Sequence, residues 1–139
     1  MRLLLLSFFF LPLCICAQEK TDRFMLEAGL VGGSENACPG HYIGLSGEVT
    51  GPLSLYSMIE NYQCQDLKGT ASRLGASLRI GPTDWLIRPE LRTGIEYDGG
   101  DVSFTYGTSL LVGGNFGARL SLHVGESLTL FQLGGYIRF

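Results

Sequence analysis

The sequence has 139 residues, 20 of them glycine, and a formal net charge of −3 at pH 7. A mildly acidic chain without a basic run excludes nucleic acid as the expected partner. The length is sufficient for one domain.

The first predicted element is a secretory signal peptide. One positive residue, Arg2, precedes an apolar run that is too short for a membrane-spanning helix, and small residues follow. We place cleavage after Ala17, which removes Arg2 and leaves 122 residues with a net charge of −4. Cys14 and Cys16 leave a lipoprotein as an alternative, which the bulky residues before each cysteine disfavour. The predicted signal peptide spans residues 1–17, and a single domain spans residues 18–139.

The rest of the chain reads as strands separated by turns. After residue 18 the apolar residues follow no helical period and alternate in short runs. Sequences such as GPTD and DGGD separate the runs, as expected of turns. We count eight runs, 24–31, 41–50, 53–62, 72–80, 86–97, 102–112, 116–124 and 128–139. This repetition predicts an all-β domain of eight strands.

The alternation separates an apolar face from a charged face. In the fourth run, Arg73 and Arg79 share one face with small residues, while leucine, alanine and isoleucine share the other. The seventh run alternates in the same way around Arg119. Pro89 falls on the apolar face of the fifth run, where it removes one backbone donor. A soluble barrel would turn the apolar face inward, whereas a membrane barrel turns it outward toward lipid.

Three features favour the membrane barrel. Arginine outnumbers lysine eight to two, Lys20 and Lys68 are predicted outside the strands, and arginine pairs well with carboxylates in a narrow interior. Small residues on the charged face suit a crowded lumen, and seven glycines lie there: Gly29, Gly44, Gly75, Gly94, Gly107, Gly117 and Gly134. The aspartates are predicted outside the strands, whereas glutamates lie within them: Asp22, Asp66, Asp84, Asp98 and Asp101 against Glu27, Glu48, Glu90 and Glu96.

Inward glutamates facing inward arginines predict a buried charge network. It could line a selective path, but an eight-stranded interior is only wide enough for side chains, so we favour a structural, space-filling role. The predicted members are Glu27, Glu48, Arg73, Arg79, Arg88, Glu90, Arg92, Glu96, Arg119 and Arg138.

The signal peptide, the eight amphipathic runs and the final residues GGYIRF together resemble the small outer-membrane β-barrels of Gram-negative bacteria, the OmpA-like and OmpX-like proteins. The resemblance implies that residues 18–139 form an outer-membrane β-barrel domain, an eight-stranded antiparallel up-and-down transmembrane β-barrel in the bacterial outer membrane. It implies outer-membrane lipid and, during biogenesis, the barrel-assembly machinery as partners, with Tyr136, Ile137 and Phe139 as the C-terminal assembly signal. A periplasmic N-terminus, also implied, places 32–40, 63–71, 98–101 and 125–127 outside the cell.

The two cysteines of the mature chain are predicted to form a disulfide. If the second and third runs form a hairpin around Gly51, the numbers of paired residues sum to about 102, as do those of Cys38 and Cys64. The compartment reached after export is oxidising. Two free thiols are the alternative.

No residues suggest a cofactor or a metal site, and one pair of residues is a candidate for catalysis. His41 with Ser34 is the only candidate base and nucleophile, and we favour an ordinary rim residue; His123, alone on the charged face, makes no metal site. We therefore expect a non-enzymatic outer-membrane barrel with a structural or surface-interaction role that presents short outer loops. The alternatives are a narrow transport channel, an outer-membrane enzyme and a secreted, soluble ligand-binding β-barrel.

Overall fold

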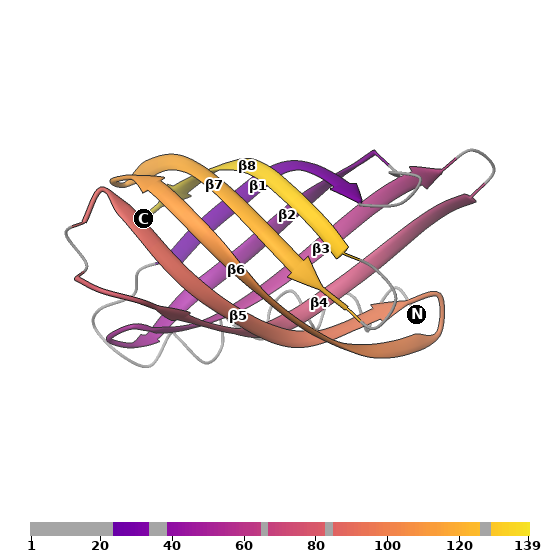
Figure 1. The fold of residues 1–139 in the computed structure, drawn as a ribbon, viewed down its shortest axis with the longest axis horizontal. Coiled ribbons are helices and arrows are strands. Elements are labelled where there is room, and N and C mark those ends of the chain that lie inside the picture. Colours follow the sequence, from indigo (N-terminus) through magenta and orange to yellow (C-terminus); the bar gives the residue numbers. More distant parts are fainter. Residues whose placement is uncertain (1–23, 34–38, 65–66, 83–84, 126–128) are drawn as a thin grey trace.

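The computed structural model describes residues 24–33, 39–64, 67–82, 85–125 and 129–139, in which eight antiparallel strands form one closed barrel (Figure 1). Their lengths, from 9 residues in β7 to 13 in β4 and β6, suit the roughly 9–11 residues that a tilted strand needs to cross a bilayer. The strands are β1 (Phe24–Gly33), β2 (Gly40–Thr50), β3 (Leu53–Cys64), β4 (Leu67–Arg79), β5 (Ile87–Asp98), β6 (Asp101–Gly113), β7 (Phe116–Val124) and β8 (Thr129–Arg138). This confirms the predicted eight strands and their order.

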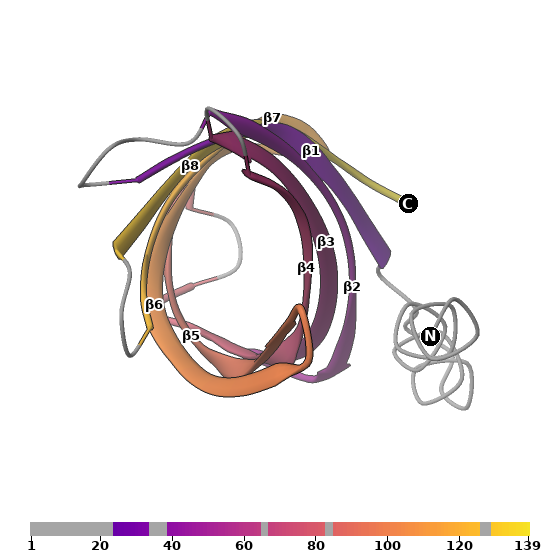
Figure 2. The ribbon, with the colours of Figure 1, turned by 90° about the vertical axis from the view of Figure 1, so that its right-hand side faces the viewer.

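The first and last strands close the barrel. Gly29 of β1 lies opposite Gly134 of β8, and Phe24 and Phe139 exchange two backbone hydrogen bonds of 3.0 Å just beyond the ladder. Figure 2 shows the wall as a continuous ring of strands. Because every described strand has a neighbour on both sides, the sheet has no free edge to pair with another chain.

The apolar face points outward and the charged face points inward. Along β7, Arg119 is 0% exposed, whereas its neighbour Leu120 is 51% exposed. Leu133, which lies opposite Leu120 on β8, is 60% exposed. A minority of apolar side chains does face inward, and Leu111 and Met25 pack there against Tyr136. The predicted orientation of the alternation is therefore confirmed.

Two glycines make the tight turn between β5 and β6. Gly99 and Gly100 have φ angles of 59° and 118°, which a two-residue hairpin loop requires and which glycine adopts without strain. The turn lets the ladder continue to Asp98 opposite Asp101, the last residue of β5 and the first of β6. The prediction that these two aspartates lie outside the strands is therefore wrong.

The hairpin of β2 and β3 has the predicted register. Gly40 lies opposite Tyr62 and Glu48 opposite Ser54, so that paired residue numbers sum to 102 until the register shifts between Glu48 and Thr50. Gly51 follows in the turn.

The predicted outer loop at 63–71 is mostly strand. The β3–β4 ladder continues through Gln63 opposite Lys68 to Cys64 opposite Leu67. Lys68 therefore lies within a strand, which corrects the prediction. The polar composition suggested a loop, but polar residues at a hairpin end can keep their backbone hydrogen bonds without burying apolar side chains.

No helix in these described ranges is long and apolar enough to cross a membrane.

Candidate functional site in the barrel interior

Buried ion pairs occupy the centre of the barrel. Glu27 of β1 accepts contacts from two arginines: Arg92 Nη2 of β5 lies 2.9 Å from its Oε1, and Arg119 Nη1 of β7 lies 2.9 Å from its Oε2. Arg119 Nη2 also contacts Glu90 Oε2 at 3.1 Å. The side chains of Glu27, Arg92 and Arg119 are 0% exposed, so each charge depends on the others for the interactions that water would otherwise provide.

A second cluster lies toward the outer end, by which we mean the end that carries the connections after odd-numbered strands. Arg73 Nη1 of β4 lies 3.1 Å from Glu60 Oε1. Arg73 Nε donates a hydrogen bond to Glu96 Oε2 at 3.0 Å. Gln132 Nε2 of β8 donates a second hydrogen bond to Glu60. One guanidinium thus holds two carboxylates, from β3 and β5.

The opposite end is richer in cations than in carboxylates. Arg88 Nη2 donates to the carbonyl oxygen of Gly113 at 2.5 Å and to the hydroxyl of Tyr136 at 2.6 Å. The Arg138 guanidinium lies 5.8 Å from the centroid of the Tyr136 ring. Arg79 Nε approaches Glu90 Oε1 only to 4.0 Å. Backbone carbonyls and an aromatic ring therefore replace some of the carboxylates that these arginines would otherwise need.

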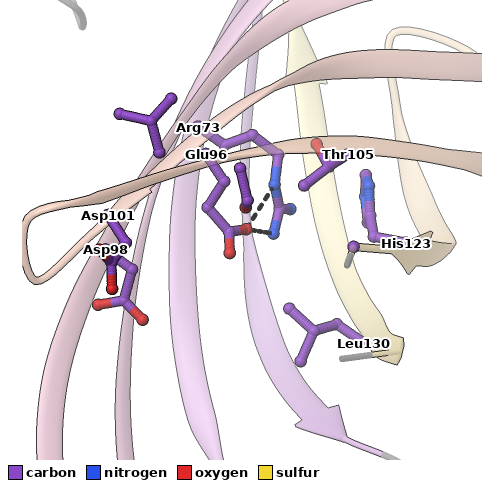
Figure 3. A pocket seen from close by; sticks show the side chains of 10 residues that line it. Arg73, Glu96, Asp98, Asp101, Thr105, His123 and Leu130 are labelled. Carbon is purple, nitrogen blue, oxygen red and sulfur yellow. Dashed lines mark hydrogen bonds and ion pairs between the residues drawn. The ribbon is translucent and has the colours of Figure 1, made fainter. Parts of the chain in front are cut away.

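A cavity of about 440 Å³ is lined in part by Arg73 and Glu96 of the outer cluster (Figure 3). Arg73 and Glu96 lie in the middle of the view, with Asp98 and Asp101 on one side and His123, Thr105 and Leu130 on the other. These residues come from β4 to β8, so the cavity belongs to the mouth of the lumen. We call it the outer mouth cavity.

Comparisons with known proteins identify the fold. A de novo designed transmembrane β-barrel superposes with a TM-score of 0.73 at 16% sequence identity, over 87% of this chain and 98% of the design. The N-terminal β-barrel domain of Pseudomonas aeruginosa OprF also gives 0.73, at 18% identity over 84% of this chain and 97% of that domain. The outer-membrane protein Ail of Yersinia pestis gives 0.63, at 11% identity over 85% and 99%.

This is the fold of a small transmembrane β-barrel. No protein-family model matches the chain, and no curated protein matches its sequence. At these identities the likeness establishes the architecture of the transmembrane barrel, whereas the chemistry of the lumen depends on this chain's own side chains.

The barrel brings together most of the residues that the sequence singled out. Ion pairs link seven of them, Glu27, Arg73, Arg79, Glu90, Arg92, Glu96 and Arg119. Arg88 and Arg138 instead contact Tyr136. Glu48 lies next to the register shift at the inner end of β2 and forms no ion pair with the other described residues.

Two members of the lumen network were missed. Glu60 and Gln132 are 3% and 0% exposed, and both contact the outer cluster. Glu60 shares the parity of Tyr56 and Met58 on the third run, so the alternation alone could have placed it inside. Gln132 carries no charge, and its contact with Glu60 depends on how the barrel brings β3 and β8 across from each other.

The remaining sequence candidates are scattered. His41 is exposed, with its Nε2 3.4 Å from Asn61 Nδ2, and Ser34 lies outside the described residues, as does Cys38. Among the residues that the structure describes, no group of three or more His, Cys, Asp or Glu side chains could hold a metal ion. Tyr136 is buried in the lumen, whereas Ile137 and Phe139 are 59% and 67% exposed on the outer face.

Proposed function

We propose that this chain is an integral, non-enzymatic protein of the bacterial outer membrane with a structural or surface-interaction role. One observation carries the proposal: large apolar side chains cover the outside of a closed wall whose inside is filled with paired charges. Exposing so much apolar surface to water is unfavourable, whereas acyl chains solvate it. The exposed set includes Leu26, Leu30, Ile43, Leu91, Ile95, Phe104, Leu110, Val112, Leu120, Phe131, Leu133 and Ile137.

Biogenesis would follow the route of OmpA-like proteins. Residues 1–17 would direct export, and the barrel-assembly machinery would read Tyr136, Ile137 and Phe139 as the terminal strand enters the membrane. The alternation of these residues, with Ile137 and Phe139 outward and Tyr136 inward, supports this because an assembly factor can contact one face of an unpaired strand. The outer end would then face the cell exterior.

A surface role fits the mouth of the barrel better than a transport role does. The centre of the lumen holds the ion-paired side chains of Glu27, Arg92 and Arg119, which are 0% exposed, and a continuous water path would have to pass this buried cluster. The outer end holds the cavity. Among structures of the same fold, Ail of Yersinia pestis was solved in complex with the heparin analogue sucrose octasulfate.

Cell fractionation tests the proposal. The protein should be found in the outer membrane, should require detergent for extraction, and should migrate differently in detergent gels before and after boiling, because the closed barrel resists unfolding until heated. A soluble periplasmic pool that stays monodisperse without detergent would instead support the soluble ligand-binding barrel. Conductance of the purified protein in planar bilayers would support the channel.

A further inference from the structure

We propose that the outer mouth cavity binds an organic cation, a primary ammonium or guanidinium group carried on a short apolar stem. The inference names a ligand class for the surface role proposed above, and it rests on that proposal for the side of the membrane from which the ligand arrives. It is carried by the charge of the cavity, by a buried histidine with one free ring nitrogen, and by the volume and lining of the cavity.

The outer mouth carries more negative than positive charge. Arg73 is the cation that lines the cavity, and Glu60 and Glu96 already occupy its guanidinium. Asp98 and Asp101, at the outer rim, form no ion pair with any other described residue. Asp98 Oδ2 accepts one hydrogen bond, from the Tyr62 hydroxyl at 2.7 Å. Both aspartates therefore retain free lone pairs and uncompensated charge at the entrance.

His123 supplies the second, independent observation. It lines the cavity and is 1% exposed, and its ring is placed to donate one N–H to the side chain of Gln132, which leaves the other ring nitrogen without a partner among the described residues. In the neutral ring one nitrogen is an acceptor, and a buried polar atom without a partner costs free energy. Thr105 beside it donates its hydroxyl proton to the Gly94 carbonyl at 3.4 Å, which leaves its oxygen able to accept. An N–H donor entering the cavity would satisfy both acceptors.

The cavity suits a small organic molecule better than a bare metal ion. Its volume of about 440 Å³ lies within the range of roughly 300–1,000 Å³ typical of small-molecule sites. The described carboxylates and histidine are not gathered closely enough to coordinate a metal. Leu130, directly opposite His123 on the neighbouring strand, forms an apolar part of the lining against which methylene groups can pack. A cation with a short stem therefore matches both the polar and the apolar lining.

The test uses 1,4-diaminobutane and the mature chain in lipid nanodiscs. The chain has two histidines, so imidazole NMR signals give a built-in comparison: His123 lines the cavity, and His41 is exposed on the outer face. The diamine should shift the His123 signals in a saturable way and leave those of His41 unchanged. The neutral analogue 1,4-butanediol should shift neither, because a charge-assisted hydrogen bond is about twice as strong as a neutral one.

Charge-neutral variants locate the site. Asp98→Asn with Asp101→Asn should weaken diamine binding roughly tenfold or more, as expected for loss of two charged acceptors. Glu48→Gln, which removes one negative charge at the other end of the lumen, should leave the affinity within about twofold, because screening limits the reach of a distant charge.

Three results would overturn the inference. The first is the absence of a saturable shift of the His123 signals. The second is that Glu48→Gln weakens diamine binding as much as the double aspartate variant does, and the third is that Mg²⁺ displaces the diamine at a lower concentration than the diamine needs to bind. Binding in nanodiscs is measured independently of where the cell places the protein. If the diamine binds in the titration but cell fractionation finds the protein soluble in the periplasm, the proposed function is refuted and the binding site is retained.

Discussion

At the scale of single residues, Glu27 holds the centre of the lumen together. Its two oxygens each meet a different arginine at 2.9 Å, and both guanidinium groups are fully buried. Arg119 keeps a second partner in Glu90, but Arg92 forms its only close ion pair among the described residues with Glu27. Removing the negative charge therefore leaves at least one buried cation without compensation.

Glu27→Gln is expected to lower the free energy of unfolding by about 3 kcal/mol, because breaking one side of a buried ion pair leaves the other charge unpaired. Urea unfolding of the protein in lipid vesicles measures the change. Glu48→Gln removes the same charge where the described structure forms no ion pair, and it should cost less than about 1 kcal/mol. Equal effects of the two substitutions would show that the central ion pairs add no stability of their own.

Pairs of strands show why small residues line the lumen. Tyr56 of β3 lies over Gly75 of β4 and Gly94 of β5, which are directly opposite each other. A Cβ at Gly75 would come within 2.8 Å of the Tyr56 ring and would also overlap the Thr93 carbonyl. The Arg92 guanidinium lies 4.2 Å from the centroid of the same ring, an arrangement that favours a cation–π interaction.

Gly75→Ala is therefore expected to destabilise the barrel by about 1–3 kcal/mol, the usual cost of overpacking a close contact. The matched control is Gly32→Ala, since a Cβ at Gly32 meets no atom within 4 Å, and its effect should stay below about 1 kcal/mol. Thermal unfolding monitored by circular dichroism gives both values. If both alanine variants unfold like the parent protein, the tyrosine–glycine packing is looser than described.

The β2–β3 hairpin supports the predicted disulfide between Cys38 and Cys64. The observed pairing sums to 102 as far as Gly40 opposite Tyr62, and the same sum would bring residues 38 and 64 together. Such a bond would close a loop of about 25 residues and contribute ~3 kcal/mol on the chain-entropy estimate.

Intact-mass measurement after alkylation tests the bond. The protein extracted from membranes should gain no alkyl group before reduction and two after it, while Cys64→Ser should expose Cys38 to alkylation without reduction. Two alkyl groups on the unreduced parent protein would rule the disulfide out.

Sequence periodicity was sufficient to predict the strands and their two faces, but it was insufficient to predict the contacts between side chains of different strands. Alternation placed Arg73, Arg119 and the seven lumen glycines on the correct face, because a period of two fixes sidedness within each strand. It could not place Gln132 against Glu60, or Tyr56 over Gly75, because such contacts depend on register and stagger around the closed barrel. The hairpin end at 63–71 was misjudged because its pairing continues through polar residues.

At the scale of the whole molecule, the charge of the lumen changes along its length. The outer end gathers Glu60, Glu96, Asp98 and Asp101 around Arg73, whereas the inner end gathers Arg79, Arg88 and Arg138. The central ion pairs separate these two regions. A ligand that enters from the outer end therefore meets the carboxylates of the outer mouth cavity first and the buried central ion pairs beyond them.

The central claim is that acyl chains contact the leucines of the outer face while the lumen excludes lipid. Nuclear Overhauser contacts between lipid acyl chains and leucine methyl groups, measured in nanodiscs, test it most directly. Leu120 and Leu133 are exposed on the wall, and Leu111, also a strand leucine, is 0% exposed inside it. We predict strong acyl-chain contacts for Leu120 and Leu133 and none for Leu111. Acyl-chain contacts at Leu111, or their absence at Leu120 and Leu133, would contradict the account.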